Sequence, residues 1–254
     1  MERLDGKVII LTGAASGIGK ATAQSLHAAG AALLLADLDP AGEAVADQIS
    51  SAGGRARFLR TDVSSEDDVA RAVDLALTSF GGLHGAANCA GIGTAPVPFA
   101  EIDSGDWDRV LGVNLNGMYY CVKHELRAIL AAGAGGSIVN VASALGATAS
   151  PNMGPYVASK HGVVGITRAA AVDYARAGVR VNAVMPGIVD TPMVSNAIAT
   201  GAYEGFLEAM KAAHPVGRLG RPEEIAAAIV WLLSDAASFV TGATLFADGG
   251  FSVP

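Results

Sequence analysis

Short apolar runs alternate along the chain with longer segments in which apolar residues recur at helical spacing. Four to six residues long and rich in Val, Ile, Leu and Ala, the runs are typical of parallel strands buried on both faces. They begin near Val8, Ala32, Arg57, Gly85, Ser137, Arg180 and Thr244. The intervening periodicity predicts helices over residues 17–29, 40–52, 66–80, 104–131, 154–176 and 222–234.

Acidic residues mark the starts of two of these helices. Ser64-Ser65-Glu66-Asp67 and Pro222-Glu223-Glu224 place carboxylates where the positive end of the helix dipole stabilises them. The alternation of strands and helices continues from Lys7 to about Phe246 without a Pro-rich or Ser-rich linker. We therefore expect one α/β domain over residues 1–254 with a doubly wound parallel sheet, a fold that binds ligands at the carboxyl ends of its strands.

The first predicted strand leads directly into a glycine-rich turn, Thr12-Gly-Ala-Ala-Ser-Gly-Ile-Gly19. Gly13 can turn tightly, Gly17 lets backbone approach a phosphate, and Gly19 lets the helix pack close to the strand. The following helix N-terminus offers unpaired N–H groups to a pyrophosphate. The spacing differs from the commoner Gly-x-Gly-x2-Gly, and such a turn can also serve packing alone. Its position on the first strand-to-helix turn favours a dinucleotide site.

Asp37 follows the second predicted strand, Ala32–Ala36. A carboxylate at this place can accept hydrogen bonds from a ribose diol and repels a 2′-phosphate. The flanking positions where a basic residue could hold that phosphate are Ser16 and Leu38, which are uncharged. The sequence therefore favours NAD over NADP. An alternative stays open, in which Asp37 and Asp39 only cap the next helix.

Tyr156 and Lys160 stand four residues apart on a predicted helix, and Ser143 lies thirteen residues before Tyr156, just past a predicted strand. Positions i and i+4 share a helix face, so the ammonium group can sit beside the phenol. A free phenol has a pKa of about 10, and a cation within about 4–6 Å lowers it. Ser143 could then hydrogen-bond the reacting oxygen. The trio predicts a tyrosine that acts as general acid and base.

Tyr119 and Lys123 repeat this four-residue spacing inside another predicted helix, so the spacing alone does not identify a site. The residue thirteen positions before Tyr119 is Asp106, in a polar stretch. We expect a structural role for Tyr119 and Lys123, whose apolar stems can cover a helix face.

Charge and cysteine content exclude several classes of protein. Seventeen basic and 24 acidic side chains give a net charge of −7 with no basic cluster, which disfavours nucleic acid as a partner. No apolar run approaches the roughly 20 residues of a membrane span, and the first residues lack the features of a secretory signal. Cys89 and Cys121 are the only cysteines, and the five histidines form no metal pattern. We expect a cytoplasmic protein without a metal.

These motifs together resemble the short-chain dehydrogenase/reductase family over essentially the whole chain. Further matches are Asp62-Val63, Asn88-Cys89-Ala90-Gly91, Asn182 and Pro186-Gly187, in which Cys89 departs from the family's second asparagine. The resemblance implies a Rossmann-like, seven-stranded parallel sheet in the order 3-2-1-4-5-6-7 with helices on both faces. It also implies a homotetramer, with helices 104–131 and 154–176 pairing between subunits and residues 239–250 in a second interface.

The resemblance assigns roles to individual residues. The implied catalytic set is Asn114, Ser143, Tyr156 and Lys160, in which Asn114 holds a water that passes protons to Lys160. The residues implied to bind NAD are Gly13, Ser16, Gly17, Ile18, Gly19, Asp37, Leu38, Asp62, Val63, Asn88, Ala90, Gly91, Tyr156, Lys160, Pro186, Gly187, Ile188 and Thr191. Thr12, Asp62 and Asn88 could also simply stabilise their loops, and the two roles are compatible.

The implied reaction is reversible hydride transfer between a secondary alcohol and nicotinamide, with Tyr156 taking or giving the hydroxyl proton. Residues 191–215 resemble the family's mobile substrate lid, and their apolar side chains favour a hydrophobic pocket, although they could equally be ordinary helix core. These side chains are Met193, Val194, Ile198, Tyr203, Phe206, Leu207 and Met210. The residues expected to bind substrate are Ser143, Leu145, Met153, Tyr156 and Met193. A hydrophobic or cyclic alcohol is favoured over a sugar.

Two other functions compete with this one. A 3-oxoacyl thioester reductase shares the architecture, but most such enzymes of fatty acid synthesis use NADPH and meet an acidic carrier protein, which Asp37 and the acidic net charge oppose. A non-catalytic dinucleotide-binding sensor or scaffold has no need of a complete proton-transfer set. The sequence therefore favours an NAD-dependent alcohol dehydrogenase.

Overall fold

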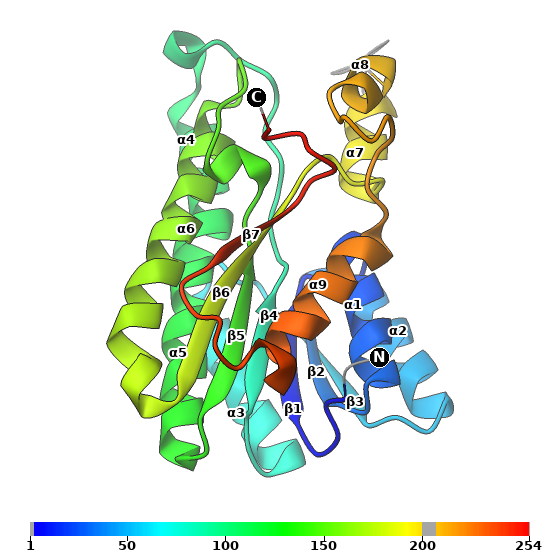
Figure 1. Ribbon diagram of the computed structural model, residues 1–254, viewed down its shortest axis with the longest axis vertical. Helices are drawn as coiled ribbons and strands as arrows, with labels where there is room; N and C mark the ends of the chain where they lie inside the picture. Colours follow the sequence, from blue (N-terminus) through cyan, green and yellow to red (C-terminus); the bar gives the residue numbers. More distant parts are fainter. Residues whose placement is uncertain (1–2, 200–206, 254) are drawn as a thin grey trace.

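The computed structural model describes residues 3–199 and 207–253, and its described strands form one seven-stranded sheet (Figure 1). The order is β3-β2-β1-β4-β5-β6-β7, and every neighbouring pair is parallel, which confirms the predicted topology. The strands are β1 Val8–Thr12, β2 Ala32–Asp37, β3 Ala56–Arg60, β4 Gly85–Asn88, β5 Gly136–Val141, β6 Val179–Pro186 and β7 Thr244–Ala247.

Helices cover both faces of the sheet. On one face lie α3 (Glu66–Phe80), α4 (Ser104–Leu111), α5 (Gly117–Ala132) and α6 (Gly154–Tyr174). The other face carries α1 (Gly17–Ala28), α2 (Ala41–Ser51) and α9 (Pro222–Leu233) (Figure 1). Two further helices, α7 (Pro192–Ala199) and α8 (Leu207–Ala212), fall in a segment for which periodicity predicted no element.

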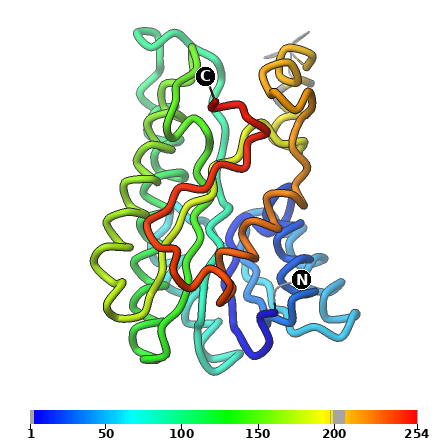
Figure 2. The backbone as a smooth tube through the Cα atoms, viewed as in Figure 1, coloured from blue at the N-terminus to red at the C-terminus, as the bar shows by residue number. Residues whose placement is uncertain are grey.

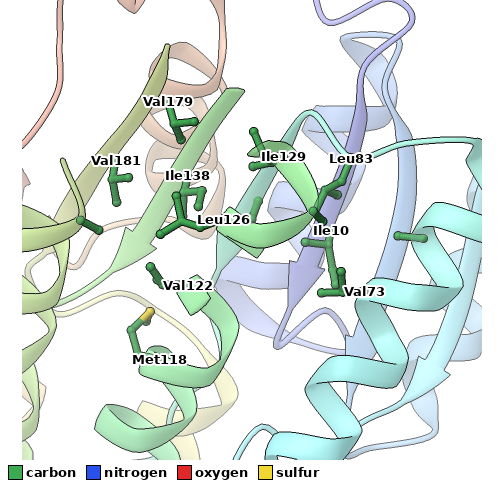
Figure 3. Packing of buried hydrophobic residues seen from close by; sticks show 14 of the residues in the cluster. Ile10, Val73, Leu83, Met118, Val122, Leu126, Ile129, Ile138, Val179 and Val181 are labelled. Atoms are coloured by element: carbon green, nitrogen blue, oxygen red, sulfur yellow. The ribbon is translucent and has the colours of Figure 1, made fainter. Parts of the chain in front are cut away.

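Alternate residues of each central strand point to opposite faces, so the sheet separates two apolar cores. Ile10 of β1 lies beside Val73 and Leu83 in the core on the α3 and α5 side, which also includes Val122 and Ile138 (Figure 3). Its neighbours Ile9 and Leu11 pack on the α1 and α9 side. This arrangement explains why the strands appear in the sequence as continuous apolar runs rather than as alternating ones.

The predicted helix over residues 104–131 is interrupted. A π-helical turn over Gly112–Asn116 separates α4 from α5. A π turn inserts one residue into the regular ladder and reorients the side chains around it, and such turns frequently occur at functional sites. Asn114 lies in this turn, so the interruption affects a predicted catalytic residue.

The strand order reverses between β1 and β4, which both leave the sheet at the same edge. Thr12 and Asn88 are direct partners in the register, and Asn88 pairs in turn with Asn140 of β5. The chain then runs back over this edge, because α7, α8 and the C-terminal segment lie beyond the carboxyl ends of the strands (Figure 2). Among the residues that the structure describes, no helix has the length and apolar character needed to cross a bilayer.

Glu125 of α5 is 1% exposed and lies against the middle of the sheet. Asn88 Nδ2 donates to its Oε2 at 2.9 Å and to Asn140 Oδ1 at 3.1 Å, and Asn140 donates to Thr167 of α6 at 3.0 Å. Burial raises the pKa of Glu125 to about 8, against the opposing effect of the Asn88 hydrogen bond. The carboxyl group is therefore mostly protonated at neutral pH.

This raised pKa predicts a measurable pH dependence of stability. Between pH 4.5 and about 8 the unfolded chain releases a proton that folded Glu125 retains, so this group's contribution to the free energy of unfolding falls as pH rises. The limiting slope for one group is about 1.4 kcal/mol per pH unit. Glu125→Gln should remove this slope, and the variant should gain stability relative to the wild type from pH 5 to pH 8 in urea titrations.

The exposed acid Glu43 of α2 offers a matched control for this measurement. Glu43→Gln should leave the change in the free energy of unfolding between pH 5 and pH 8 the same as in the wild type. Parallel pH profiles for wild type and Glu125→Gln would show that the buried carboxyl group ionises normally.

Candidate active site

The glycine turn closes tightly between β1 and α1. Gly13 has a φ of +68° and packs against the segment after β4, because a Cβ here would lie 2.7 Å from Ala90 N. A Cβ on Gly19 would lie 1.9 Å from Gly13 O. Both positions therefore require glycine, and the turn brings backbone and helix end together as the sequence predicted.

The free N–H groups at the N-terminus of α1 have no side-chain cap, whereas those of α3 do. Ser65 caps α3, which has three acidic residues in its first turn, whereas α1 has no side-chain cap at Ser16 and no acidic residue there. The N–H groups at Gly17, Ile18 and Gly19 thus keep the positive end of the dipole for an external anion. This uncapped end beside a closed glycine turn fits the pyrophosphate of a dinucleotide.

Asp37 stands at the end of β2 and faces the same turn. Its Oδ2 accepts a hydrogen bond from Ala15 N at 2.8 Å, and its Oδ1 accepts one from Asp39 N at 2.9 Å. The start of α2 is instead held by Asp39, whose Oδ1 accepts from Ala41 N at 2.9 Å. Asp37 is therefore fixed against the glycine turn and is not the cap of α2, while the half-exposed Leu38 follows it.

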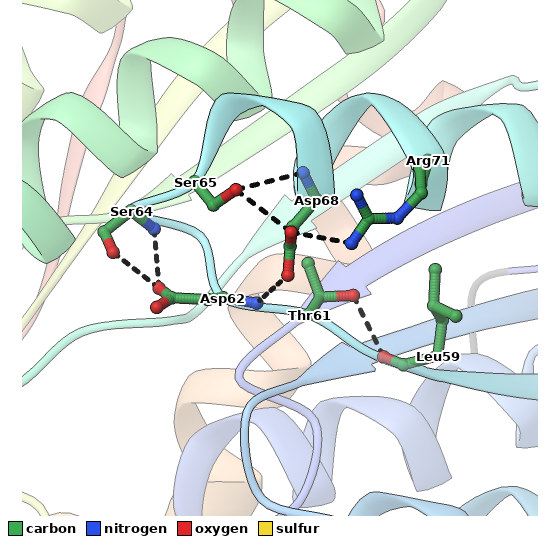
Figure 4. Close-up of polar contacts among 7 residues, drawn as sticks. All are labelled: Leu59, Thr61, Asp62, Ser64, Ser65, Asp68 and Arg71. Carbon is green, nitrogen blue, oxygen red and sulfur yellow. Dashed lines mark hydrogen bonds and ion pairs between the residues drawn. The ribbon is translucent and has the colours of Figure 1, made fainter.

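Asp62 and Val63 form the wall beyond β3. Asp62 Oδ1 accepts from both the backbone and the hydroxyl of Ser64, at 2.9 and 2.6 Å, and Asp62 N donates to Asp68 Oδ2 at 3.1 Å (Figure 4). Val63 is buried with Val69. These bonds stabilise the loop, and they hold Asp62 at the same sheet edge as Asp37.

The segment after β4 lies between the glycine turn and the predicted catalytic residues. Ala90 N donates to Thr12 Oγ1 at 3.3 Å. Burial raises the pKa of the Cys89 thiol to about 12, with a Thr22 hydrogen bond and the Lys160 charge opposing, so this thiol is not a reactive one. A Cβ on Gly91 would lie 3.5 Å from Lys160 Nζ, so Gly91 lets the backbone pass close to the ammonium group.

Ser143, Tyr156 and Lys160 meet where β5 and α6 come together. Ser143 lies close enough to the half-buried Tyr156 side chain to oppose the rise in its pKa that burial causes, and Ser143 Oγ accepts from Leu145 N at 3.2 Å. Lys160 is 4% exposed; its Nζ donates to Val141 O at 3.0 Å and lies 5.5 Å from the centroid of the Tyr156 ring. The predicted trio is therefore assembled.

The expected lowering of the Tyr156 pKa by Lys160 is not found. Burial raises the pKa of Tyr156, and only the hydrogen bond from Ser143 opposes that rise. Burial also lowers the pKa of Lys160 to about 8. The physical reason is that the phenol is itself buried, which disfavours the charged phenolate, while Lys160 Nζ lies over the face of the ring and donates to Val141 O.

Asn114 faces the site from the π-helical turn, and both ends of its amide are used. Its Oδ1 accepts from Ile92 N at 2.8 Å, and its Nδ2 donates to Ile92 O at 2.9 Å and to Ser159 Oγ at 3.3 Å. Ser159 in turn donates to Tyr156 O at 2.7 Å. The Asn114 side chain thus ties the loop after β4 to α6, one residue before Lys160.

Tyr119 and Lys123 have a different environment. Tyr119 is 49% exposed, and Lys123 pairs with Glu66 of α3 while its Nζ lies 5.7 Å from the Tyr119 ring centroid. No serine shares a hydrogen bond with the Tyr119 side chain in the described contacts. This pair joins α5 to α3, as expected of a structural pair.

The loop after β6 returns to the glycine turn. Pro186 ends β6, and a Cβ on Gly17 would lie 3.2 Å from Thr191 Cγ2. A Cβ on Gly93 would lie 3.9 Å from Met193 Cγ, so the start of α7 lies above the segment after β4. The 46%-exposed Met193 is therefore near the site, whereas Tyr203 and Phe206 lie outside the described residues.

A cavity of about 690 Å³ opens beside the start of α6. Met153 lines it together with Phe99, Ala147, Val157 and His161. Ser143, Tyr156 and Lys160 do not line it, so it lies on a neighbouring face of α6 and is not the reacting site. Leu145, half-buried, directly follows the Ser143 turn and stays on the site's side of the chain.

Sequence reasoning missed several residues that shape the site. Ile92 and Val141 contribute only backbone groups, which leave no signal in a sequence. Ser159 could have been noticed as a small polar residue next to Lys160 on a buried helix face. Arg60 pairs with Asp37 in the strand register, and its Nε donates to Leu38 O at 3.1 Å, but only the strand pairing shows that they are neighbours.

Comparisons with known proteins agree with this geometry. Residues 13–252 match the family described as enoyl-(acyl carrier protein) reductase. A 2,5-dichloro-2,5-cyclohexadiene-1,4-diol dehydrogenase from Sphingobium indicum is 47% identical over 99% of both chains. A cis-4-hydroxycyclohexanecarboxylate dehydrogenase from Sinomonas cyclohexanicum is 48% identical over 97% of this chain and 96% of its own. The crystal structure of a short-chain type dehydrogenase/reductase from Mycobacterium marinum is 32% identical, covers 99% of this chain and 98% of its own, and gives a TM-score of 0.93.

The closed glycine turn generates a stability prediction. Gly19→Ala places a methyl group 1.9 Å from Gly13 O, which forces the backbone to move and should destabilise the protein by about 2 kcal/mol or more. Gly165 of α6 is the matched control, since a Cβ there meets no atom within 4 Å. Gly165→Ala should be neutral or stabilising by up to about 1 kcal/mol. Urea unfolding of both variants would check this, and equal stabilities would contradict it.

Proposed function

Because the chain belongs to the short-chain dehydrogenase/reductase family of oxidoreductases, we propose that it interconverts a cyclic or hydrophobic secondary alcohol and its ketone, with NAD as cofactor. The observation that carries the proposal is that Ser143, Tyr156 and the buried Lys160 come together, with Lys160 Nζ 5.5 Å from the centroid of the Tyr156 ring and Ser143 close enough to oppose the rise in the Tyr156 pKa. This group faces the segment after β4, which on its other side packs against the glycine turn. Proton transfer and dinucleotide binding thus share one sheet edge.

The nicotinamide, when bound, supplies the acceptor for the hydride that leaves the alcohol carbon. In the same direction Tyr156 takes the hydroxyl proton, and Ser143 donates a hydrogen bond to the substrate oxygen as negative charge develops on it. Lys160 holds positive charge beside the phenolate form of Tyr156, which becomes the neutral phenol when it takes this proton. Asn114 keeps the loop after β4 and the Lys160 turn of α6 in register, and we propose that it connects Lys160 to water.

The dinucleotide is proposed to lie along the carboxyl edge from Asp62 to Thr191. The pyrophosphate meets the uncapped end of α1, Asp37 accepts the ribose hydroxyls, and Val63 borders the adenine. Asn88, Ala90 and Gly91 line the middle of the path. Pro186, Gly187, Ile188 and Thr191 border the nicotinamide end.

Two kinds of support favour a cyclic alcohol. The names of both related dehydrogenases specify six-membered carbocyclic alcohols, and each relative covers almost the whole chain. Leu145, whose N–H donates to Ser143, and Met193, above the segment after β4, are apolar, which suits a carbocycle better than a polyol. Although the matched family carries an acyl carrier protein in its description, the net charge of −7 makes docking of an acidic carrier unfavourable.

The remaining features of the proposal concern the molecule as a whole. We propose that residues 1–254 form one dinucleotide-binding domain and that the described parts of the predicted lid over 191–215, residues 191–199 and 207–215, border the substrate; residues 200–206 lie outside the described residues. The protein is a cytoplasmic homotetramer that binds neither nucleic acid nor membrane. Support for self-association comes from apolar side chains on the outer surface, where Val172 of α6 is 80% exposed and Phe239 is fully exposed.

Tyr156→Phe tests the reaction directly. Loss of a general acid/base typically lowers kcat by about 10²–10⁴-fold, and cofactor binding should be largely kept. Steady-state NADH formation with a cyclohexanol would measure kcat, and a titration with NADH would measure cofactor binding. The control is Tyr119→Phe, which changes the other tyrosine of the four-residue pattern and should leave kcat unchanged. A fully active Tyr156→Phe enzyme would exclude this mechanism.

Asp37 predicts the cofactor preference. The wild type should have a much higher kcat/KM with NAD than with NADP, because the carboxylate repels a 2′-phosphate. Asp37→Ser should narrow this ratio by at least about 10-fold, the effect of 1.4 kcal/mol, since Arg60 then remains as an unopposed cation. Asp39→Ser, which alters the α2 cap instead, should leave the ratio unchanged. Equal wild-type efficiency with the two cofactors would refute the assignment.

A further inference from the structure

His214 lies just after α8, and its polar side chain is buried outside the proposed reacting group. It is 2% exposed. Its Nδ1 lies 2.7 Å from Met210 O, and its Nε2 lies 3.0 Å from Ile188 N. A carbonyl can only accept, so Nδ1 carries the proton, and Nε2 is the acceptor for the Ile188 N–H.

The His214 ring also contacts the C-terminal segment. Its centroid lies 5.2 Å from that of the Phe251 ring, and Val216 N donates to Gly249 O at 3.3 Å. Gly187 is packed against the ring, since a Cβ there would lie 2.6 Å from Nε2. We call the meeting of Gly187, Ile188, His214 and Phe251 the His214 junction.

The two chain segments that flank α7 and α8 are joined at this point. Gly220 N donates to Ile188 O, and Asp190 N donates to Gly220 O, both at 2.9 Å. Ile188 thus uses its carbonyl in this backbone pairing and its N–H in the bond to His214. Removing the imidazole acceptor would leave a half-buried N–H without its partner, and the loop would shift to recover one.

We propose that His214 is a positioning residue for the reaction: by accepting the Ile188 N–H it fixes the loop after β6, and with it the nicotinamide end of the cofactor site. This inference rests on the proposed function, because the loop matters to chemistry only if it borders the reacting ring. The adenosine end of the site, around Asp37 and Asp62, has no contact with His214. A change at His214 should therefore affect orientation at the reacting end and spare binding of the other end.

Two substitutions of His214 separate the roles of its two ring nitrogens. The Gln side chain of His214→Gln reaches as far as Nε2 with its amide oxygen and can still accept from Ile188. The shorter Asn of His214→Asn can replace Nδ1 as the donor to Met210 O but falls short of Ile188. We expect His214→Asn to lower kcat by between about 10- and 100-fold, the cost of a misplaced reacting group. His214→Gln should recover most of that loss.

Binding of ADP-ribose, which lacks nicotinamide, distinguishes positioning from a general loss of structure. A general loss of structure would also weaken ADP-ribose binding, whereas a change confined to the nicotinamide end would not. The dissociation constant of ADP-ribose should be the same in wild type and both variants, and His27→Gln, on α1 at the opposite edge of the sheet, serves as the control. Unchanged kcat in His214→Asn, equal losses in both variants, or weakened ADP-ribose binding would each overturn the proposal. An inactive wild type that still binds ADP-ribose would instead overturn the proposed function.

Discussion

A buried ammonium group holds the proposed site together. Lys160 is almost fully buried, and Val141 O is the acceptor that the structure gives it, beside the face of the Tyr156 ring. Burying a charge is unfavourable unless neighbouring groups compensate, and here burial already lowers the pKa of Lys160 to about 8. The site tolerates this cost because β5, α6 and the loop after β4 approach so closely. Gly146 and Gly91 make that approach possible, since a Cβ on Gly146 would lie 2.8 Å from Lys160 O and one on Gly91 would lie 3.3 Å from Asn114 Oδ1.

Most of the fold could be predicted because its signals are local. Continuous apolar runs separated by helical periodicity specify a parallel sheet, and the described strands begin within one residue of the predicted positions. The glycine turn, Asp37 and the Ser143, Tyr156 and Lys160 set were also accessible, since each follows a strand end or a helix spacing. The expectation of a cyclic alcohol likewise agrees with the names of the related dehydrogenases.

What could not be predicted depends on contacts between distant segments. Asn114 owes its orientation to a π-helical turn that the apolar periodicity does not reveal, and its partner Ile92 offers only backbone groups. Arg60 and Asp37 are neighbours because of the register between β2 and β3, which their separation in the sequence does not reveal. The predicted lowering of the Tyr156 pKa by Lys160 is not found, because a shared helix face fixes proximity but not the burial of the phenol, which raises its pKa.

The segment that carries α7 and α8 begins and ends at the same place on the sheet edge, and this limits the effect of changes in its length. Two backbone hydrogen bonds join the chain at Ile188 and Asp190 to Gly220. The residues between Asp190 and Gly220 therefore form an excursion from the sheet whose two ends are paired. Closing such an excursion costs little more free energy when it grows by a few residues. Changes in length between Asp190 and Gly220 should therefore leave the sheet and its carboxyl edge unaltered.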